Sequence, residues 1–305
     1  MNRAIRQILR AAVTAAVAIP MLLMGCGSGP SGGHMPVIED QAGAQSRAVP
    51  FVEEERVTTG QTMLAEFGAS HYEPQPRESK KQEASQRQVH AETPVAYLTF
   101  DDGPSGHTGA ILNILREQGV PATFFVIGKE GERHLESYRR IIREGHALGN
   151  HTYSHQYSTI YRSVEDFKAD AAKLDKLLLH VTGTKPGILR FPGGSNNRLS
   201  WRAGGRHIME KLTREMSDTD IPYFDWNVSS TDAAAAVMSK QAIVDAVKSN
   251  SAGKRQIIVL MHDTDPKTTT VQALPDIIAH LKERGYAFRV LDNHAFRCQF
   301  LQQPS

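Results

Sequence analysis

Between residues 93 and 291, strand-like and helix-like segments alternate regularly, and this order restricts the folds open to the chain. Short runs rich in β-branched and aromatic residues, such as 95–100 and 122–127, alternate with amphipathic runs, several of which end in glycine. Strands joined by helices lie parallel, so the alternation predicts an α/β fold that is either an open doubly wound sheet or a closed barrel. The other expected strands cover residues 146–150, 188–191, 223–228, 256–261 and 287–291, and the expected helices cover residues 110–118, 133–143, 164–180, 207–216, 240–249 and 271–284.

Two observations favour the barrel. No Gly-x-Gly-x-x-Gly fingerprint follows the first expected strand, which argues against a dinucleotide-binding fold. Polar residues that suit catalysis lie at or just past the C-terminal ends of the expected strands, the face that carries the active site in β/α barrels. We therefore predict a distorted, incomplete (β/α) barrel of about seven parallel strands. The polar residues at the strand ends are Asp101, Asp102, His151, His155, Arg190, Asp225, His262 and Asp263.

The first 92 residues differ in composition from the rest of the chain. Arginines precede an apolar segment, residues 11–24, which is too short to span a membrane comfortably and has the layout of a secretory signal. The Leu-Met-Gly-Cys sequence that ends at Cys26 resembles a bacterial lipobox; a signal peptide cut near Gly27, or an uncleaved anchor, is the alternative. Residues 26–92 are rich in Gly, Ser, Pro, Gln and charge, which predicts a flexible linker. The expected organisation is a lipoprotein-type signal peptide (1–25), a linker (26–92) and a folded domain (93–305).

The signal segment and the charge also restrict location and partners. We expect an exported protein of the cell envelope, held through lipid on Cys26 to a membrane at its periplasmic or extracellular face. A lipidated Cys26 leaves Cys298 without a disulfide partner; a disulfide between these two cysteines is the alternative. The net charge of +2 is too small to indicate nucleic-acid binding. The expected state is a monomer.

Two adjacent carboxylates, Asp101 and Asp102, follow the first expected strand and precede a Gly-Pro turn. Neighbouring carboxylates repel each other, so burial in one site favours a division of labour: one binds a cation or pairs with arginine, and the other handles a proton. His151 and His155 are four residues apart, which puts both rings on one side of a helical turn and within reach of one metal ion. Two histidines and one acid are the usual ligands of a catalytic metal.

Further strand ends carry groups that suit proton transfer and sugar binding. Arg190 can pair with the aspartate that is not a metal ligand and hold it ionised. Trp226 belongs either to the core or to a sugar-stacking surface. His262 ends a strongly apolar strand and can donate a proton near neutral pH.

The sequences TFDDGPS, HTYSH, RFPGG, DW and LMHD, in this order between residues 99 and 263, resemble the motifs of the NodB-homology polysaccharide deacetylases, carbohydrate esterase family 4. The resemblance covers residues 93–291 and implies a distorted (β/α) barrel that removes N-acetyl groups from a polymer of N-acetylglucosamine (GlcNAc) with one divalent metal ion. Zinc is the expected metal, with cobalt, nickel or iron as alternatives. The implied catalytic residues are the general base Asp101 with Arg190 as its partner, and the acid His262 with Asp225 as its partner. The implied metal ligands are Asp102, His151 and His155, and the implied substrate-binding residues are Tyr153, Pro192, Trp226 and Leu260. The backbone N–H of Tyr153 or Ser154 is the implied donor to the oxyanion.

The chain departs from the family pattern in two places. Gly193 follows Pro192 where an aromatic residue often stands, so one wall of the substrate groove is lower or is supplied from elsewhere. Asp232 lies in a stretch of uncertain structure and is an alternative to Asp225 as the partner of His262.

The expected substrate is peptidoglycan, a choice that rests on the envelope location and not on the catalytic motifs. Poly-GlcNAc, chitin oligomers and acetylated xylan are the alternatives within the same class. A barrel glycosidase would need two acids separated across the scissile bond and would not need the histidine pair. A non-catalytic sugar-binding lipoprotein would be expected to lack at least one of Asp101, His155 and His262, and all three are present.

Overall fold

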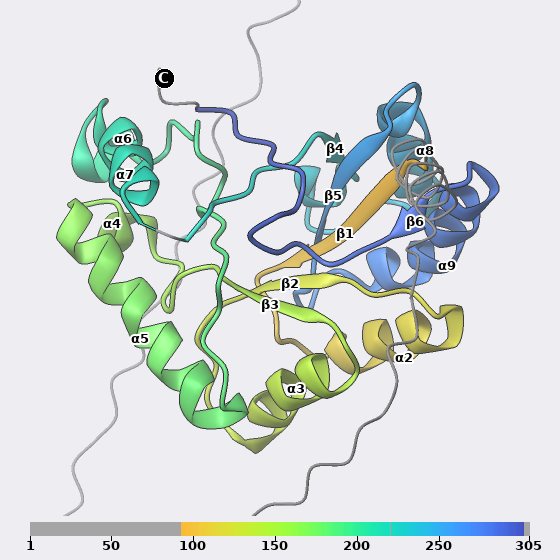
Figure 1. The fold of residues 1–305 in the computed structure, drawn as a ribbon, viewed down its shortest axis with the longest axis horizontal. Coiled ribbons are helices and arrows are strands. Elements are labelled where there is room, and N and C mark those ends of the chain that lie inside the picture. The colour runs from red at the N-terminus through yellow and green to blue at the C-terminus, as the bar shows by residue number, and fades with distance from the viewer. Residues whose placement is uncertain (1–92, 220, 302–305) are drawn as a thin grey trace, which may run out of the picture. The chain divides into compact units, whose positions relative to one another are not determined.

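The computed structural model describes residues 93–219 and 221–301 (Figure 1). The predicted signal peptide, the lipidation site Cys26 and the linker lie outside the described residues. Every helix in the described part is too short or too polar to cross a bilayer.

A parallel sheet forms the centre of the domain, and its long central strands are β1 and β5. The strand order is β3-β2-β1-β5-β4, and β6 pairs with the first residues of β1. The bounds are β1 (Val95–Asp101), β2 (Thr123–Val126), β3 (Ala147–Asn150), β4 (Val228–Ser229), β5 (Gln256–His262) and β6 (Ala287–Phe288).

Isolated backbone bridges extend the sheet beyond β3 and curve it towards a barrel. Leu189 bridges Asn150 at the end of β3 on one side and Tyr223 on the other. The chain then runs from Tyr223 to β4, which pairs with β5. The backbone pairing therefore returns to the central strands, and the prediction of a distorted, incomplete barrel is confirmed.

Two of the predicted strands, 188–191 and 223–228, are reduced to isolated bridges at Leu189 and Tyr223, and of the second only Val228 belongs to a strand, β4. Pro192 ends the first segment because it has no N–H for a ladder. In the second, the N–H of Asp225 turns to the carbonyl of Cys298 instead of a neighbouring strand. The partners of this second segment are Leu189, which bridges Tyr223, and Cys298, which accepts from Asp225. The residues of the segment itself do not predict either partner.

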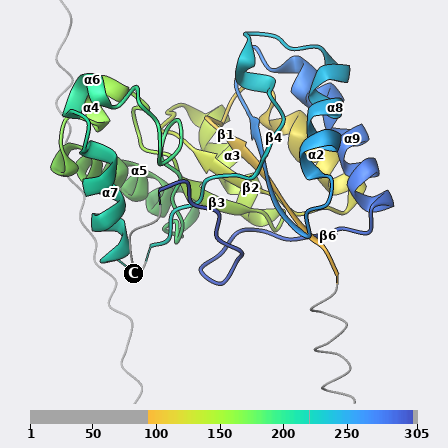
Figure 2. The ribbon, with the colours of Figure 1, turned by 90° about the horizontal axis from the view of Figure 1, so that it is seen from above.

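Helices cover the outside of the sheet, with α2, α3, α8 and α9 around the central strands and α4 to α7 grouped on the other side (Figures 1 and 2). Six of these, α2, α3, α5, α7, α8 and α9, overlap predicted helices, whereas the short α4 and α6 and the 3₁₀ helix η1 were not predicted. The bounds are α2 (Thr108–Gln118), α3 (Glu132–Arg143), α4 (Tyr157–Ile160), α5 (Val164–Thr182), α6 (Trp201–Gly204), α7 (Ile208–Ser217), the 3₁₀ helix η1 (Asp232–Ala234), α8 (Lys240–Ser251) and α9 (Thr268–Glu283).

The side-chain alternation of β1 decides what faces the barrel interior. Leu98 and Phe100 belong to the large apolar cluster under the helices, whereas Val95 and Tyr97 belong to a separate inner cluster. Alternate residues of a strand share a face, so Asp101 continues the inner row. The strand thus delivers a carboxylate to the carboxyl end of the barrel interior.

Candidate active site

The two longest strands place the predicted base and acid side by side. Asp101 is the last residue of β1, and its Cα partner in the parallel register is His262, the last residue of β5. Asp101 is buried, and most of the His262 side chain is covered. The register alone therefore brings a carboxylate and an imidazole together at the carboxyl edge of the sheet.

The three predicted metal ligands form one cluster beside this pair. One ligand atom each from Asp102, His151 and His155 lies within 4.8 Å of the others. The Oδ1 atom of Asp102 is 3.4 Å from Nε2 of His151 and 3.2 Å from Nε2 of His155. The structure thus brings together one carboxylate oxygen and two imidazole nitrogens from separate loops.

The protonation pattern of the cluster suits a divalent cation. Nδ1 of His151 lies 2.8 Å from the carbonyl oxygen of Arg190; a donor is needed there, so Nδ1 carries the proton and Nε2 presents its lone pair to Asp102. Oδ1 of Asp102 is buried and has no hydrogen-bond donor among the described residues. A buried carboxylate oxygen facing imidazole lone pairs is destabilising unless a cation lies between them. The donors present fit a metal with two histidines and one acid.

The HTYSH loop differs from the helical turn that its spacing predicted. Thr152 and His155 have positive φ angles of 68° and 53°, so the loop is not helical. Its N–H groups bind side chains: Thr152 N–H donates to Oδ1 of Asn150 (2.8 Å), and the N–H groups of Tyr153 and Ser154 donate to Oδ1 of Asp170 (2.5 and 2.9 Å). The predicted role of the latter two as oxyanion donors is therefore wrong, because Asp170 occupies both.

Arg190 holds one oxygen of Asp101 and leaves the other free. Its Nη1 donates to Oδ1 of Asp101 and to the hydroxyl of Thr99, each at 2.7 Å. The Arg190 side chain is 0% exposed, and its other nitrogens donate to the carbonyls of Phe224 and Asp225. The guanidinium is thus fixed, and the predicted pairing of Arg190 with Asp101 is present in the structure. Oδ2 of Asp101 points towards the cluster of Asp102, His151 and His155, and it lies 3.7 Å from Nε2 of His151.

Asp232, and not Asp225, is the partner of His262. Oδ1 of Asp232 lies 2.8 Å from Nδ1 of His262, and its Oδ2 accepts from the His262 N–H at 2.8 Å and the Thr270 hydroxyl at 3.0 Å. Burial lowers the pKa of His262, but the hydrogen bond and charge of Asp232, with smaller contributions from Asp101 and Asp102, raise that pKa to about 9. The imidazole is therefore held as a proton donor at neutral pH.

Asp225 is instead fully used within the scaffold. Its carboxylate accepts hydrogen bonds from the Ser195 N–H (2.8 Å), the Ser195 hydroxyl (2.5 Å) and the Phe300 N–H (2.7 Å). Burial raises the pKa of Asp225. The expectation that Asp225 orients His262 is wrong, because these partners occupy both oxygens.

The predicted substrate-binding residues come from several segments of the chain. Leu260 lies two residues before His262 in β5, and Trp226 packs edge-on against Phe300 and borders the Gly194 turn. Pro192 is buried, and its carbonyl accepts from the Tyr161 hydroxyl. Tyr153 packs under the Lys173 ammonium and donates its hydroxyl to Glu130.

Two residues that received no role from the sequence belong to the site. Tyr157 packs edge-on against His155, and a Cβ atom at Gly193 would overlap its hydroxyl oxygen. Tyr157 therefore supplies the aromatic wall that Gly193 lacks, and its position two residues after His155 was the only signal. Asp263 is buried and accepts from the hydroxyls of Ser105 and Thr108 at 2.6 Å each, which ties the loop after β1 to the end of β5.

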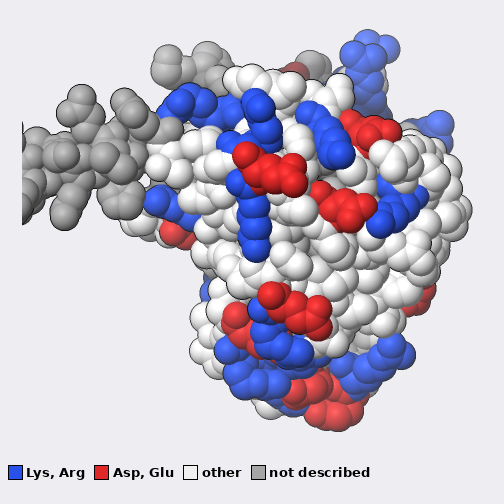
Figure 3. Space-filling view, turned by 90° about the vertical axis from the view of Figure 1, so that its right-hand side faces the viewer, with Lys and Arg blue, Asp and Glu red and all other residues white. Residues whose placement is uncertain are grey.

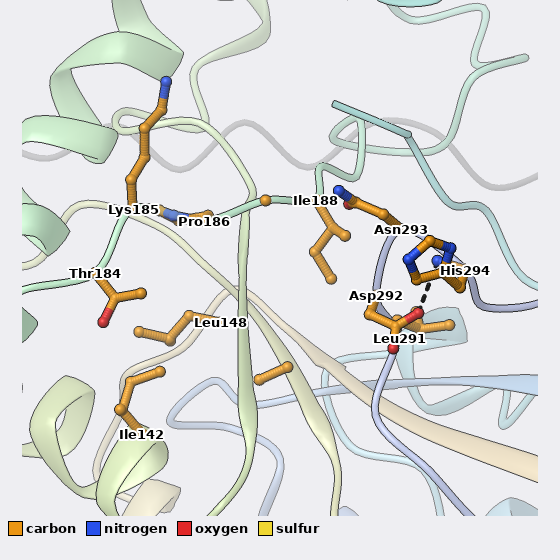
Figure 4. Close-up of a pocket in the computed structure, with 12 residues that line it drawn as sticks. Ile142, Leu148, Thr184, Lys185, Pro186, Ile188, Leu291, Asp292, Asn293 and His294 are labelled. Carbon is orange, nitrogen blue, oxygen red and sulfur yellow. Dashed lines mark hydrogen bonds between the residues drawn. The ribbon is translucent and has the colours of Figure 1, made fainter. Parts of the chain in front are cut away.

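A separate cavity of about 410 Å³ lies at the other end of β3 (Figure 4). It is bordered by Leu148, Ile188, Leu291 and residues 184–187, and the Asp292 carboxylate at its edge accepts from the His294 N–H. No residue predicted for the site lines it.

The barrel and the cluster at its carboxyl edge place a candidate metal site next to the predicted base and the predicted acid. Residues 88–211 match the sequence profile of the family described as polysaccharide deacetylase. A peptidoglycan-N-acetylglucosamine deacetylase of Bacillus cereus is 34% identical over 219 residues, which cover 70% of this chain and 75% of that protein. A chitooligosaccharide deacetylase of Rhizobium leguminosarum bv. trifolii is 32% identical and is covered over 89% of its length, against 64% of this chain.

Solved structures agree with the sequence relatives. The catalytic domain of a peptidoglycan N-acetylglucosamine deacetylase from Eubacterium rectale has a TM-score of 0.65 and 32% identity, with 70% of this chain and 94% of that chain covered. A Streptococcus mutans CE4 esterase has a TM-score of 0.58 and 32% identity, with 68% and 90% covered. The chain belongs to the polysaccharide deacetylase family.

Proposed function

We propose that this protein removes N-acetyl groups from GlcNAc residues of peptidoglycan by metal-dependent hydrolysis and releases acetate. The observation that carries the proposal is the meeting of the Asp102, His151 and His155 cluster with the Asp101–Arg190 and His262–Asp232 pairs at one edge of the barrel. The names of the Bacillus and Eubacterium relatives support peptidoglycan as the substrate.

Asp102, His151 and His155 would hold the metal ion, and we propose zinc, with cobalt, nickel or iron as alternatives. When bound, such an ion supplies a Lewis acid that polarises a carbonyl and lowers the pKa of water. The His151–Arg190 carbonyl contact fixes the ring that would carry the ligand nitrogen.

Asp101 acts as the general base. Arg190 fixes the orientation of the Asp101 side chain by donating to Oδ1, and the Thr99 hydroxyl accepts from the same guanidinium nitrogen and helps to hold it. Oδ2 of Asp101 is therefore the oxygen free to take a proton. It accepts the proton of the water that attacks the acetamide carbonyl carbon. The positive charge of Arg190 compensates the ionised carboxylate in its buried position.

His262 acts as the general acid. Its Nδ1–H donates to Asp232, so the proton on Nε2 is the one that can reach the substrate. As the carbon–nitrogen bond breaks, His262 donates this proton to the departing amine, and the products are acetate and a glucosamine unit. Asp232 stabilises the imidazolium before the transfer and keeps its ring oriented.

Trp226 and Leu260 border the acetyl group and the sugar in this proposal. Leu260 shares a strand with His262, and the Trp226 ring lies beside the turn that follows Pro192. Aromatic rings of this kind bind the apolar faces of sugars.

We also propose that the chain is exported and works as a monomer anchored to the envelope through lipid on Cys26. The support for this location is the arginine-preceded apolar segment and the lipobox-like sequence before Cys26.

Metal content and acetate release measured together test the function. We expect the full chain to bind about one divalent ion and to release acetate from peptidoglycan, with chelation abolishing the release. Asp101→Asn should keep the metal and lose turnover by about 10³-fold or more, whereas His155→Ala should lose the metal. A metal-free preparation with full activity contradicts the mechanism, and equal metal loss in both variants contradicts the division of roles between Asp101 and Asp102.

A further inference from the structure

A basic and apolar surface lies next to the site on and around the short helix α6 (Trp201–Gly204). We call it the α6 surface and define it by Arg198, Leu199, Trp201, Arg202 and Arg206. Leu199 is 59% exposed and Trp201 is 37% exposed, and they are two of the few large apolar side chains exposed in the described part of the chain. Large apolar groups gathered at one exposed place indicate a binding surface.

The charge of the α6 surface is not balanced. Residues 193–206 contain three arginines and no aspartate or glutamate. No carboxylate of the residues described by the structure lies within ion-pair distance of Arg198, Arg202 or Arg206. By contrast, the face that carries α8 and α9 has Lys and Arg intermixed with Asp and Glu (Figure 3), as in the 2.8 Å pair of Lys240 and Asp276.

Two of these arginines lie close to the Trp201 ring. The guanidinium carbons of Arg198 and Arg206 each lie 5.5 Å from the centre of the Trp201 ring system. Such cation–π contacts favour one position of an exposed ring. The arrangement offers an aromatic face for a sugar and guanidinium groups for a carboxylate.

The α6 surface borders a groove that extends to Tyr157, next to the active site. A groove of about 530 Å³ is lined by Tyr157, Ser158, Arg162, Leu199, Arg202 and Ala203. Tyr157 also contacts the predicted metal ligand His155, with 5.7 Å between the ring centres. Arg162 is paired with Asp166, so Arg202 is the groove arginine with an uncompensated charge among the described residues.

We propose that this groove binds the part of the glycan next to the sugar that is deacetylated, and that it selects glycans carrying carboxylate groups over neutral ones. The inference rests on the proposed deacetylase function and adds the charge of the substrate to it. Arg202, helped by Arg198 and Arg206, pairs with a carboxylate of an acidic sugar or of an attached peptide, and Trp201 stacks on the glycan. The expectation of peptidoglycan from the sequence rests on the envelope location. The argument for an anionic polymer made here rests instead on residues beside the site.

The test compares two substrates of equal length, a neutral chitin oligomer and a carboxylate-bearing peptidoglycan strand, with the full-length holoenzyme. The quantity measured is the ratio of kcat/KM for the anionic substrate to that for the neutral one. We expect Arg202→Ala to lower this ratio by about 2–5-fold, as loss of one partly exposed ion pair does, and Arg202→Lys to retain most of it. Arg289→Ala, a change of an exposed arginine elsewhere, is the matched control and should keep the wild-type ratio.

Two further arms identify the source of the effect. Strands with and without their peptides separate a sugar carboxylate from a peptide carboxylate as the partner. Trp201→Ala should raise KM for both substrates, because stacking does not depend on charge. Added salt should lower the wild-type ratio more than that of Arg202→Ala.

If Arg202→Ala leaves the ratio of kcat/KM for the two substrates unchanged, the inference is overturned. Acetate release from both substrates in the same experiment would still support the deacetylase function. A wild-type enzyme that releases acetate from neither substrate contradicts the function itself. Binding to anionic lipid vesicles that is lost in an Arg198→Ala, Arg202→Ala, Arg206→Ala variant, together with an unchanged ratio, would overturn the glycan assignment in favour of a membrane contact.

Discussion

The carboxylate that pairs with His262 could not be identified from the sequence alone. Asp225 lies within the predicted strand 223–228 and Asp232 lies shortly after it, and Asp232 was the alternative to Asp225. The choice depends on the return of the chain through η1, which brings Asp232 under the end of β5, and on the occupation of Asp225 by Ser195 and Phe300. Neither contact is visible as a local pattern.

Asp232→Asn should move the alkaline limb of the pH profile. The pKa of His262 is raised to about 9, so the acid is protonated below that pH and is lost above it; a bound cation nearby would lower this limit. Removal of the Asp232 charge lowers the pKa of His262 towards its ordinary value of about 6.5, so the alkaline limb of kcat/KM should shift to lower pH by about one unit or more. Measurement of kcat/KM between pH 5 and about 10 checks this.

Asp225→Asn is the control for that experiment. It should lower the melting temperature, because the buried carboxylate accepts three hydrogen bonds, and it should leave the alkaline limb in place. A profile that moves in Asp225→Asn and stays fixed in Asp232→Asn would reverse the assignment made from the structure.

The Tyr157 hydroxyl occupies the space that a side chain at Gly193 would need. Gly193 has a φ of 78°, and a Cβ atom there would overlap the Tyr157 hydroxyl. Gly193→Ala should therefore lower the free energy of unfolding by about 2–4 kcal/mol, from backbone strain and overlap together. Adding Tyr157→Phe should recover part of this loss because it removes the overlapping oxygen but not the strain. Urea unfolding of the two single variants and the double variant measures the coupling, and strictly additive effects would disprove it.

At the scale of elements, the long strands and helices were predictable and the short connecting segments were not. β1 and β5 carry strong apolar patterns, and their ends deliver Asp101 and His262 as expected. The HTYSH loop and the bridges at Leu189 and Tyr223 depend on partners far away in the chain, among them Asp170. Local spacing therefore predicted that His151 and His155 share one cluster with Asp102, which the structure shows, but it gave the wrong backbone geometry for the two histidines.

The loop after β1 depends on one buried carboxylate. Asp263 accepts from Ser105 and Thr108, and a Cβ atom at Gly103 would lie 2.5 Å from its Oδ2, so the loop packs directly on it. Asp263→Ala should lower the free energy of unfolding by about 2–4 kcal/mol, since two buried hydroxyls lose their acceptor. It should also weaken metal binding, because Asp102 begins the same loop.

Unfolding in urea and metal titration check these two effects. Asp265→Ala provides the comparison, because Asp265 accepts from the exposed Gly106 N–H on the same loop and should matter much less. Metal affinity equal to wild type in Asp263→Ala would show that the loop does not need this anchor to present Asp102.

At the scale of the whole domain, the last described residues complete the barrel. The Cys298 carbonyl accepts from the Asp225 N–H, the Phe300 N–H donates to the Asp225 carboxylate, and the Phe300 ring packs against Trp226. These contacts replace the strand ladder that residues 223–228 lack. The C-terminal segment is therefore part of the frame that positions Arg190, because Arg190 donates to the Asp225 carbonyl.

A chain that ends at Arg297 should lose stability and activity together. Truncation leaves the Asp225 N–H without its acceptor and removes one of the two donors to Oδ2 of Asp225. A buried polar group without a partner costs about 1–3 kcal/mol. Because Asp102, His151 and His155 lie on other loops, metal content should fall less than acetate release.

Phe300→Ala separates the two contributions of this segment, since it keeps the backbone N–H on Asp225 and removes only the ring beside Trp226. We expect it to raise KM by weakening the support of Trp226, with a smaller loss of stability than the truncation. If the truncated chain melted at the wild-type temperature and kept its turnover, the closure of the barrel by this segment would be irrelevant to the site, and Arg190 would have to be positioned by β1 and Phe125 alone.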